Sequence, residues 1–182
     1  MNIIIIVGII IIILLLVICY NGIIKAKNEV DKCFSNMDVM LKKRWDLVPN
    51  LIESVKEYMR HEEETLTKII NIRKKDYNKL NDDEKVNVDK DLSDSMYNLN
   101  VLSESYPNLK ANENFIELKR QLRIIEEDIS VSRTIYNSSV TNYNNKISIF
   151  PLNLFAKILG FKEKKLYKID NKERENVKIK FN

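Results

Sequence analysis

The chain has 182 residues, 45% hydrophobic and 31% charged, and its 30 basic and 26 acidic side chains give a net charge of +4. This length allows one domain with an appendage, and so small a positive excess gives no reason to expect nucleic acid as a partner. With only 3 Gly, 2 Cys and 1 His, the sequence excludes a Walker loop, a G-x-G-x-x-G turn, a pair of histidine metal ligands and a C-x-x-C site.

Residues 1–24 carry no charged side chain, and nearly all residues from Ile3 to Cys19 are Ile, Leu or Val. A helix from Ile3 to Ile24 is about 33 Å long, which is enough to cross the hydrocarbon core of a bilayer. The alternatives are a cleaved signal peptide and a buried core helix, but a basic N-terminal region and a small-residue cleavage site are both missing. Residues 1–24 are therefore predicted to be a transmembrane anchor, with the lipid bilayer as the partner of residues 3–24.

The charges that flank the anchor predict its orientation. No Lys or Arg precedes it, whereas Lys25, Lys27 and Lys32 follow closely. The positive-inside rule then keeps the remainder of the chain in the cytoplasm and the N-terminus outside. The same three lysines are expected at the level of the lipid headgroups. The two cysteines are not expected to pair.

Residues 25–161 are predicted to form an all-α, antiparallel helical bundle of three long helices plus a short C-terminal helix. The first helix is expected from Lys25 to about Leu80, with Pro49 kinking it because the apolar stripe keeps its phase across the proline. The stripe is Val30, Phe34, Met37, Leu41, Trp45, Val48, Ile52, Val55 and Met59. The charged side chains on this helix, Lys42 to Arg44 among them, are expected to be solvated.

The second helix is expected to begin after the capping residues at Asn81 and to end before Pro107, which disfavours a helical Tyr106. The third helix begins near Asn112 or Asn114, and its apolar residues continue at near-heptad spacing to Ile147. Acidic residues on this helix, such as Glu126, are expected to be exposed.

A short apolar helix is predicted within residues 150–161, with Pro151 near its start and Gly160 as its stop. The charged segment 162–182 is expected to be a loosely ordered tail.

Helix lengths predict how these elements are arranged. If the second helix returns toward the membrane and the 106–114 connection is extended, the third helix ends level with the far end of the first. Residues 150–161 would then cap the bundle far from the lipid. Val30, Phe34, Met37 and Leu41 would lack a cover, which makes self-association into a homo-oligomer a subsidiary prediction.

Candidate sites are few. Glu57 and His61 are the best metal candidates, but a single Glu-x-x-x-His does not make a di-iron bundle, and a solvated acidic helix face is the simpler interpretation. No metal, cofactor or catalytic residue is predicted. Candidate interaction residues come from the inter-helix loop and the C-terminal apolar segment: Tyr106, Pro107, Asn108, Lys110, Asn112, Asn114, Phe150 and Phe155.

Several segments together resemble the LemA family. They are Asp38–Tyr58, Tyr106–Phe115, the Tyr136-Asn and Tyr143-Asn pairs, Phe150-Pro-Leu-Asn-Leu and Gly160-Phe161. The departures are Trp45, where a His or Tyr is usual, and a longer polar break near Asn81. The resemblance implies a bacterial membrane-anchored helical bundle and implies no reaction.

The predicted function is that of a membrane-anchored, non-enzymatic interaction or scaffold protein whose partner is an unidentified envelope protein. Two alternatives stay open: a metal-binding or enzymatic bundle that uses His61 and Glu57, and a lipid-binding module that uses residues 150–161.

Overall fold

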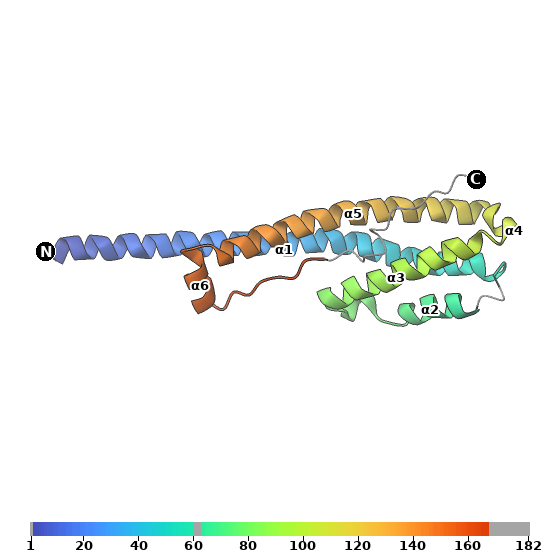
Figure 1. Ribbon diagram of the computed structural model, residues 1–182, viewed down its shortest axis with the longest axis horizontal. Coiled ribbons are helices and arrows are strands. Elements are labelled where there is room, and N and C mark those ends of the chain that lie inside the picture. Colours follow the sequence, from blue (N-terminus) through green and yellow to red (C-terminus); the bar gives the residue numbers. More distant parts are fainter. Residues whose placement is uncertain (1, 60–62, 168–182) are drawn as a thin grey trace, which may run out of the picture. The chain divides into compact units, whose positions relative to one another are not determined.

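The computed structural model describes residues 2–59 and 63–167, without the side chains of Asn2 and Glu63. Within these residues the chain is all-α, as predicted, and the helices are labelled in Figure 1. They are α1 (Asn2–Lys56), α2 (Glu63–Arg73), a 3₁₀ turn (Tyr77–Lys79), α3 (Asp82–Ser103), α4 (Pro107–Lys110), α5 (Glu113–Ser148) and α6 (Leu152–Ile158).

The chain divides into two compact units, and α1 and α5 contribute to both. The anchor unit, as it is named here, comprises Met1–Asp31 and Ile135–Asn182. The bundle unit comprises Lys32–Thr134. Each is described by itself below.

The first helix of the bundle unit passes through Pro49 without a break but ends at Lys56, well before the expected Leu80. Between Met59 and Leu66 the sequence has no apolar residue, so a continuous helix would have no side chain to bury for nearly two turns. After α2, the ring of Tyr77 lies 5.3 Å from that of Trp45. The chain has therefore reversed direction, and α2 runs back along α1.

This reversal changes the direction of the next helix. Lys85 forms an ion pair with Asp38 at 2.7 Å, and further along both segments Asn112 donates a hydrogen bond to the Tyr58 hydroxyl at 3.1 Å. The residue numbers therefore increase in the same direction along both segments: Asp38 pairs with Lys85, and Tyr58 pairs with Asn112. The prediction that the second long helix runs antiparallel to the first is wrong, because α2 makes the return and α3 runs parallel to α1.

The start of α3 is the one that the sequence predicts. The Asn81 side chain accepts from the Glu84 amide at 2.9 Å, and the Glu84 carboxylate accepts from the Asn81 amide at 2.8 Å. This capping box satisfies two of the amides that a helix start leaves without an intrahelical partner.

The connection from α3 to α5 is compact, so the condition of an extended connection, on which the arrangement from helix lengths depended, is not met. Residues 107–110 form the short helix α4, and the Asn112 side chain accepts from the Phe115 amide at 3.0 Å to cap the start of α5. No extended descent is needed, because α3 already runs in the direction of α1 and α5 makes the second return.

In the anchor unit, the end of α5 packs against α1 just beyond its apolar segment. The buried cluster consists of Ile23, Ala26, Val30, Val140, Tyr143, Ile147 and Ala156. Residues 150–161 therefore lie beside the apolar segment, and the prediction that they cap the far end of the bundle is wrong. Val30, Phe34, Met37 and Leu41 are all buried within the single chain, so the reason given for self-association is also removed.

Helix α6 ends as its sequence predicts. Gly160 has φ of 74°, a left-handed conformation that favours glycine, and the Phe161 amide donates to the Ala156 carbonyl at 2.9 Å.

Candidate functional site

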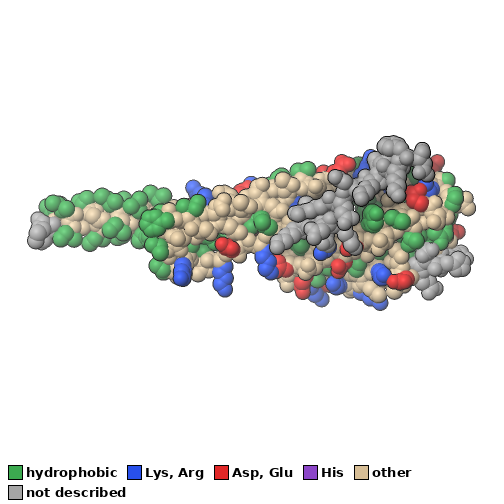
Figure 2. Space-filling view, in the orientation of Figure 1, with side chains coloured by type: hydrophobic (Ala, Val, Ile, Leu, Met, Phe, Trp, Pro, Cys, Tyr) green, Lys and Arg blue, Asp and Glu red, His purple; other side chains and the backbone are tan. Residues whose placement is uncertain are grey.

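The apolar N-terminal part of α1 is the most exposed hydrophobic element of the described chain. Its mean hydropathy reaches 3.6 over an 18-residue window, none of which is buried. By length and composition, it is long and apolar enough to cross a membrane. In Figure 2 hydrophobic side chains cover this part of the helix. This finding is consistent with membrane anchoring.

Helix α6 is apolar on two faces. Its inner face carries the buried Ala156, and Leu152 and Phe161 pack against the same cluster. The Phe161 ring also lies 6.3 Å from the ring of Tyr20 on α1. The exposed apolar side chains of α6 and of the residues directly before and after it, named here the α6 outer face, are Ile149, Phe150, Leu154, Ile158 and Leu159. Lys157 is the charged residue of the helix, and it is exposed as well.

A shallow apolar hollow of about 340 Å³ lies between α6 and the apolar segment of α1. Phe155, Ile158 and Leu159 line it from α6. Leu16, Val17 and Tyr20 line it from α1. Of the predicted interaction residues, the half-buried Phe155 therefore lies next to the apolar segment, and Phe150 is exposed.

The lysines predicted to be near the membrane, Lys25, Lys27 and Lys32, are exposed on α1 directly after the apolar segment. Lys157 and Lys162 are exposed as well, on α6 and just after it, and basic side chains are visible beside the α6 region in Figure 2. Of these lysines, all but Lys32 belong to the anchor unit, so positive charge gathers in that unit where its apolar surface ends.

The segment after α6 is not loosely ordered where the structure describes it. Residues 162–167, named here the strap, run extended along α5 and are held by two Tyr-Asn pairs spaced seven residues apart in the sequence. Asn144 exchanges two hydrogen bonds with the backbone of Lys164, at 2.8 and 2.9 Å. Asn137 does the same with Tyr167, at 2.9 and 2.8 Å. Residues 168–182 lie outside the described residues.

The tyrosines of these pairs complete the attachment. The Tyr143 hydroxyl donates to the Lys162 carbonyl at 3.0 Å, and the Tyr136 hydroxyl donates to the Lys165 carbonyl at 3.2 Å. Burial, with a contribution from Asp31, raises the pKa of Tyr143, so its hydroxyl stays a neutral donor at physiological pH.

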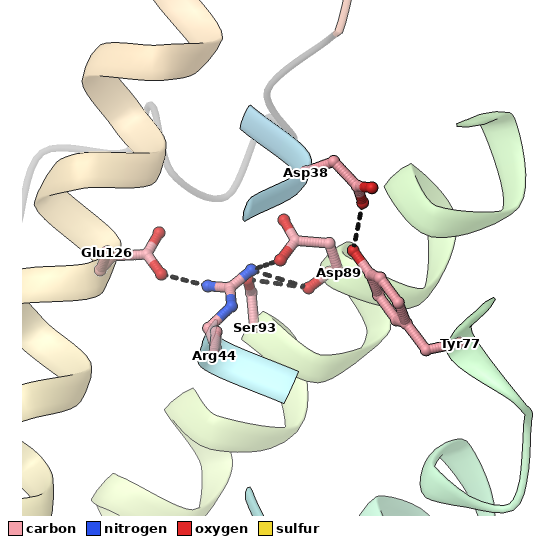
Figure 3. A network of polar contacts seen from close by, with 6 residues as sticks. All are labelled: Asp38, Arg44, Tyr77, Asp89, Ser93 and Glu126. Atoms are coloured by element: carbon pink, nitrogen blue, oxygen red, sulfur yellow. Dashed lines mark hydrogen bonds and ion pairs between the residues drawn. The ribbon is translucent and has the colours of Figure 1, made fainter. Parts of the chain in front are cut away.

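A second polar site lies inside the bundle unit, where Arg44 is buried rather than solvated as predicted (Figure 3). It forms ion pairs with Asp89 of α3 and Glu126 of α5, and donates to the Asp89 backbone carbonyl at 3.2 Å. Ser93 donates to the same carbonyl at 3.0 Å. Glu126, expected to be exposed, is half-buried by this pairing. The network joins three helices of the unit.

The pattern that reveals Arg44 is present in the sequence. The residue comes three after Leu41 and four before Val48, so it keeps the 3–4 spacing of the buried stripe although it is charged. A charge in such a position requires a partner on a neighbouring helix, because an unpaired buried charge is very costly. The sequence does not indicate which acidic residue is that partner.

Next to this network, Asp38 receives hydrogen bonds from Tyr77 and Lys85, both at 2.7 Å. Burial and then the hydrogen bond to Asp38 raise the pKa of Tyr77 well above its usual range. The Arg73 guanidinium lies 4.5 Å from the centre of the Trp45 ring. These contacts fasten the reversed segment of α2 and the 3₁₀ turn to α1.

The predicted interaction loop forms the turn between α3 and α5. Asn108 and Asn114 are exposed, and with Tyr58 and the half-buried Asn112 they line an open polar hollow of about 660 Å³. Lys110 pairs with Glu104 at 2.5 Å, which lowers the pKa of that carboxyl. Tyr106 is half-buried and Pro107 exposed at the start of α4.

The metal alternative lies partly outside the described residues, because His61 does. Glu57 is exposed. Among the residues that the structure describes, no three His, Cys, Asp or Glu side chains are grouped so that they could hold a metal ion.

Comparison with known proteins agrees with the resemblance seen in the sequence. The model of the LemA family matches residues 33–181. A curated relative, Protein LemA from Metamycoplasma hominis, is 26% identical over 158 residues, which cover 86% of this chain and 72% of the relative. Since the family match extends over well more than half of its residues, this chain belongs to the LemA family.

Proposed function

We propose that this chain is a membrane-anchored, non-enzymatic interaction protein of the bacterial cell envelope, with its bundle in the cytoplasm. The observation that carries the proposal is the continuity of α1, which runs without a break from the apolar segment into the bundle unit. A helix that both crosses a bilayer and supplies a bundle's first core stripe holds that bundle at the membrane surface.

The interaction role is supported by the pairing of charged side chains within the bundle unit, where they hold helices together. Arg44, Asp89 and Glu126 are paired with one another, as are Asp38, Tyr77 and Lys85, and both sets hold helices together. The polar hollow at the turn between α3 and α5 is lined by three amide side chains, Asn108, Asn112 and Asn114, together with Tyr58, Ala111 and Glu113. Amides donate and accept hydrogen bonds without titrating, which suits recognition of another protein's backbone or polar side chains.

The proposal is tested in living cells with the full-length chain and a photo-crosslinking amino acid at one position at a time. Asn108 and Asn114, which line the hollow, are each expected to give the same discrete adduct with an envelope protein. The matched control is Asn98, which is exposed on α3 away from the hollow residues in sequence. Adducts from neither hollow position, or the same adducts from Asn98, would contradict the proposal.

A further inference from the structure

We propose that the α6 outer face lies in the interface of an anionic lipid bilayer, beside the point where α1 leaves the membrane. This inference rests on the proposed anchoring by α1 and adds a second, non-spanning contact with the same bilayer. It uses only residues of the anchor unit.

The depth of α6 follows from its contacts with α1. A hydrocarbon core of about 30 Å takes up about 20 helical residues, so a span that begins at Ile3 ends near Gly22. Leu16, Val17 and Tyr20 share the hollow with α6, and they fall in the last third of that span. Helix α6 therefore faces the boundary between hydrocarbon and headgroups, where interfacial helices lie.

The composition of α6 suits that depth. Ile158 is 81% exposed and Phe150 74% exposed, although the opposite face of the helix is already packed. Water is a poor environment for such large apolar side chains gathered on one short segment. Because the exposed apolar surface continues that of α1, one bilayer covers both. A partner protein would have to compete with the lipid that α1 itself requires.

Charge favours an anionic bilayer. In the described part of the anchor unit, residues 2–31 and 135–167, seven lysines stand against three carboxylates. The lysines are Lys25, Lys27, Lys146, Lys157, Lys162, Lys164 and Lys165, and the carboxylates are Glu29, Asp31 and Glu163. The sequence of the bundle unit, residues 32–134, has 18 basic and 20 acidic residues. The positive excess thus accompanies the apolar surface, as in segments that bind anionic headgroups.

The attachment of α6 keeps its outer face in place. Leu152, Ala156 and Phe161 fix the inner face to the cluster, and the strap that follows is hydrogen-bonded to α5. A seven-residue helix is too short to be stable alone, so these contacts present the outer face to the lipid already formed.

The test measures depth in the full-length chain, reconstituted in vesicles of phosphatidylcholine and phosphatidylglycerol. In a background with Cys19→Ala and Cys33→Ala, an environment-sensitive dye is attached at Leu14→Cys, Ile158→Cys or Thr141→Cys. Ile158 and Thr141 are both exposed, so each can be reached by the dye. The label at Ile158 is expected to show blue-shifted emission and quenching by a nitroxide carried high on the lipid acyl chain. The label at Thr141 is expected to show neither.

The three positions separate the two proposals. If Leu14 is not quenched, the anchoring by α1 fails. If Leu14 is quenched and Ile158 behaves like Thr141, the anchoring stands and the inference for α6 is overturned. A blue-shifted label at Ile158 that lipid nitroxides do not quench indicates a protein cover and also overturns it.

A second comparison tests the anionic lipid. Quenching at Ile158 is expected to fall when phosphatidylglycerol is omitted, and when Lys157→Gln and Lys162→Gln are combined. Quenching that is unchanged in both cases would overturn the claim that the α6 outer face requires anionic lipid.

Discussion

At the scale of single residues, the buried Arg44 joins three helices of the bundle unit through its ion pairs. Its side chain is 1% exposed and that of Asp89 is 3% exposed, whereas Glu126 is 46% exposed. Asp89 is thus the partner that is fully removed from water. Removing one member of a buried pair leaves an uncompensated charge, which destabilises far more than the loss of a surface pair.

Asp89→Ala is expected to lower the free energy of unfolding by about 3 kcal/mol, because Arg44 then stays buried with only the half-exposed Glu126. Denaturant unfolding of the full-length protein in detergent, followed by the emission of the buried Trp45, measures this loss. The matched control is Asp91→Ala on the exposed side of the same helix, expected to change stability by less than about 0.5 kcal/mol. Equal stability of the two variants would show that the Asp89 carboxylate is not needed.

At the scale of elements, the spacing of the two asparagines along α5 matches the spacing of the strap residues to which they are hydrogen-bonded. Seven residues of helix, from Asn137 to Asn144, rise about 10.5 Å, and three residues of extended chain, from Lys164 to Tyr167, cover about 10 Å. Each asparagine amide offers one donor and one acceptor to a strand residue, as a neighbouring β-strand would. A helix thereby orders an extended segment without a sheet.

Replacing both asparagines, Asn137→Ala with Asn144→Ala, is expected to release the strap while α5 remains helical. Hydrogen exchange is the measurement, because the amides of Lys164 and Tyr167 lose their acceptors and should exchange much faster. Asn142→Ala, at an exposed position on the same helix, is the control and should leave both amides protected. Unchanged protection in the double variant would mean that these side chains do not hold the strap.

At the scale of the whole molecule, one missed helix end accounts for several wrong predictions. The sequence places the end of the first helix near Leu80, whereas α1 ends at Lys56 and α2 runs back along it. That extra reversal turns α3 parallel to α1, makes an extended connection unnecessary and returns the end of α5 to the Ile23 cluster. Residues 150–161 consequently lie beside the apolar segment of α1.

The proposed orientation of the whole chain is tested by cysteine accessibility in a background without native cysteines. A membrane-impermeant maleimide added to intact cells is expected to label Asn2→Cys, which precedes the apolar segment, and not Thr141→Cys. Inverted membrane vesicles should give the opposite result, because the positive-inside rule predicts that the side with the lysines faces the cytoplasm. Labelling of Thr141→Cys from outside would reverse the proposed topology.

The sequence by itself determined the elements whose signals are local. The apolar segment of α1, the capping box at Asn81, the start of α5 at Asn112 and the stop at Gly160 depend on neighbouring residues alone, and each lies where the pattern predicts. The buried stripe of α1 is equally local, because helical spacing decides which residues share a face.

Only the tertiary structure decided which segments meet. The partner of Arg44 on α3, the contact of the Tyr-Asn pairs with the strap and the position of α6 beside Tyr20 all join residues far apart in sequence. Such contacts depend on the direction of every intervening helix, so one reversal between Met59 and Leu66 moves them all. Hydrophobic spacing defines the face that a helix buries, but not the helix that covers it.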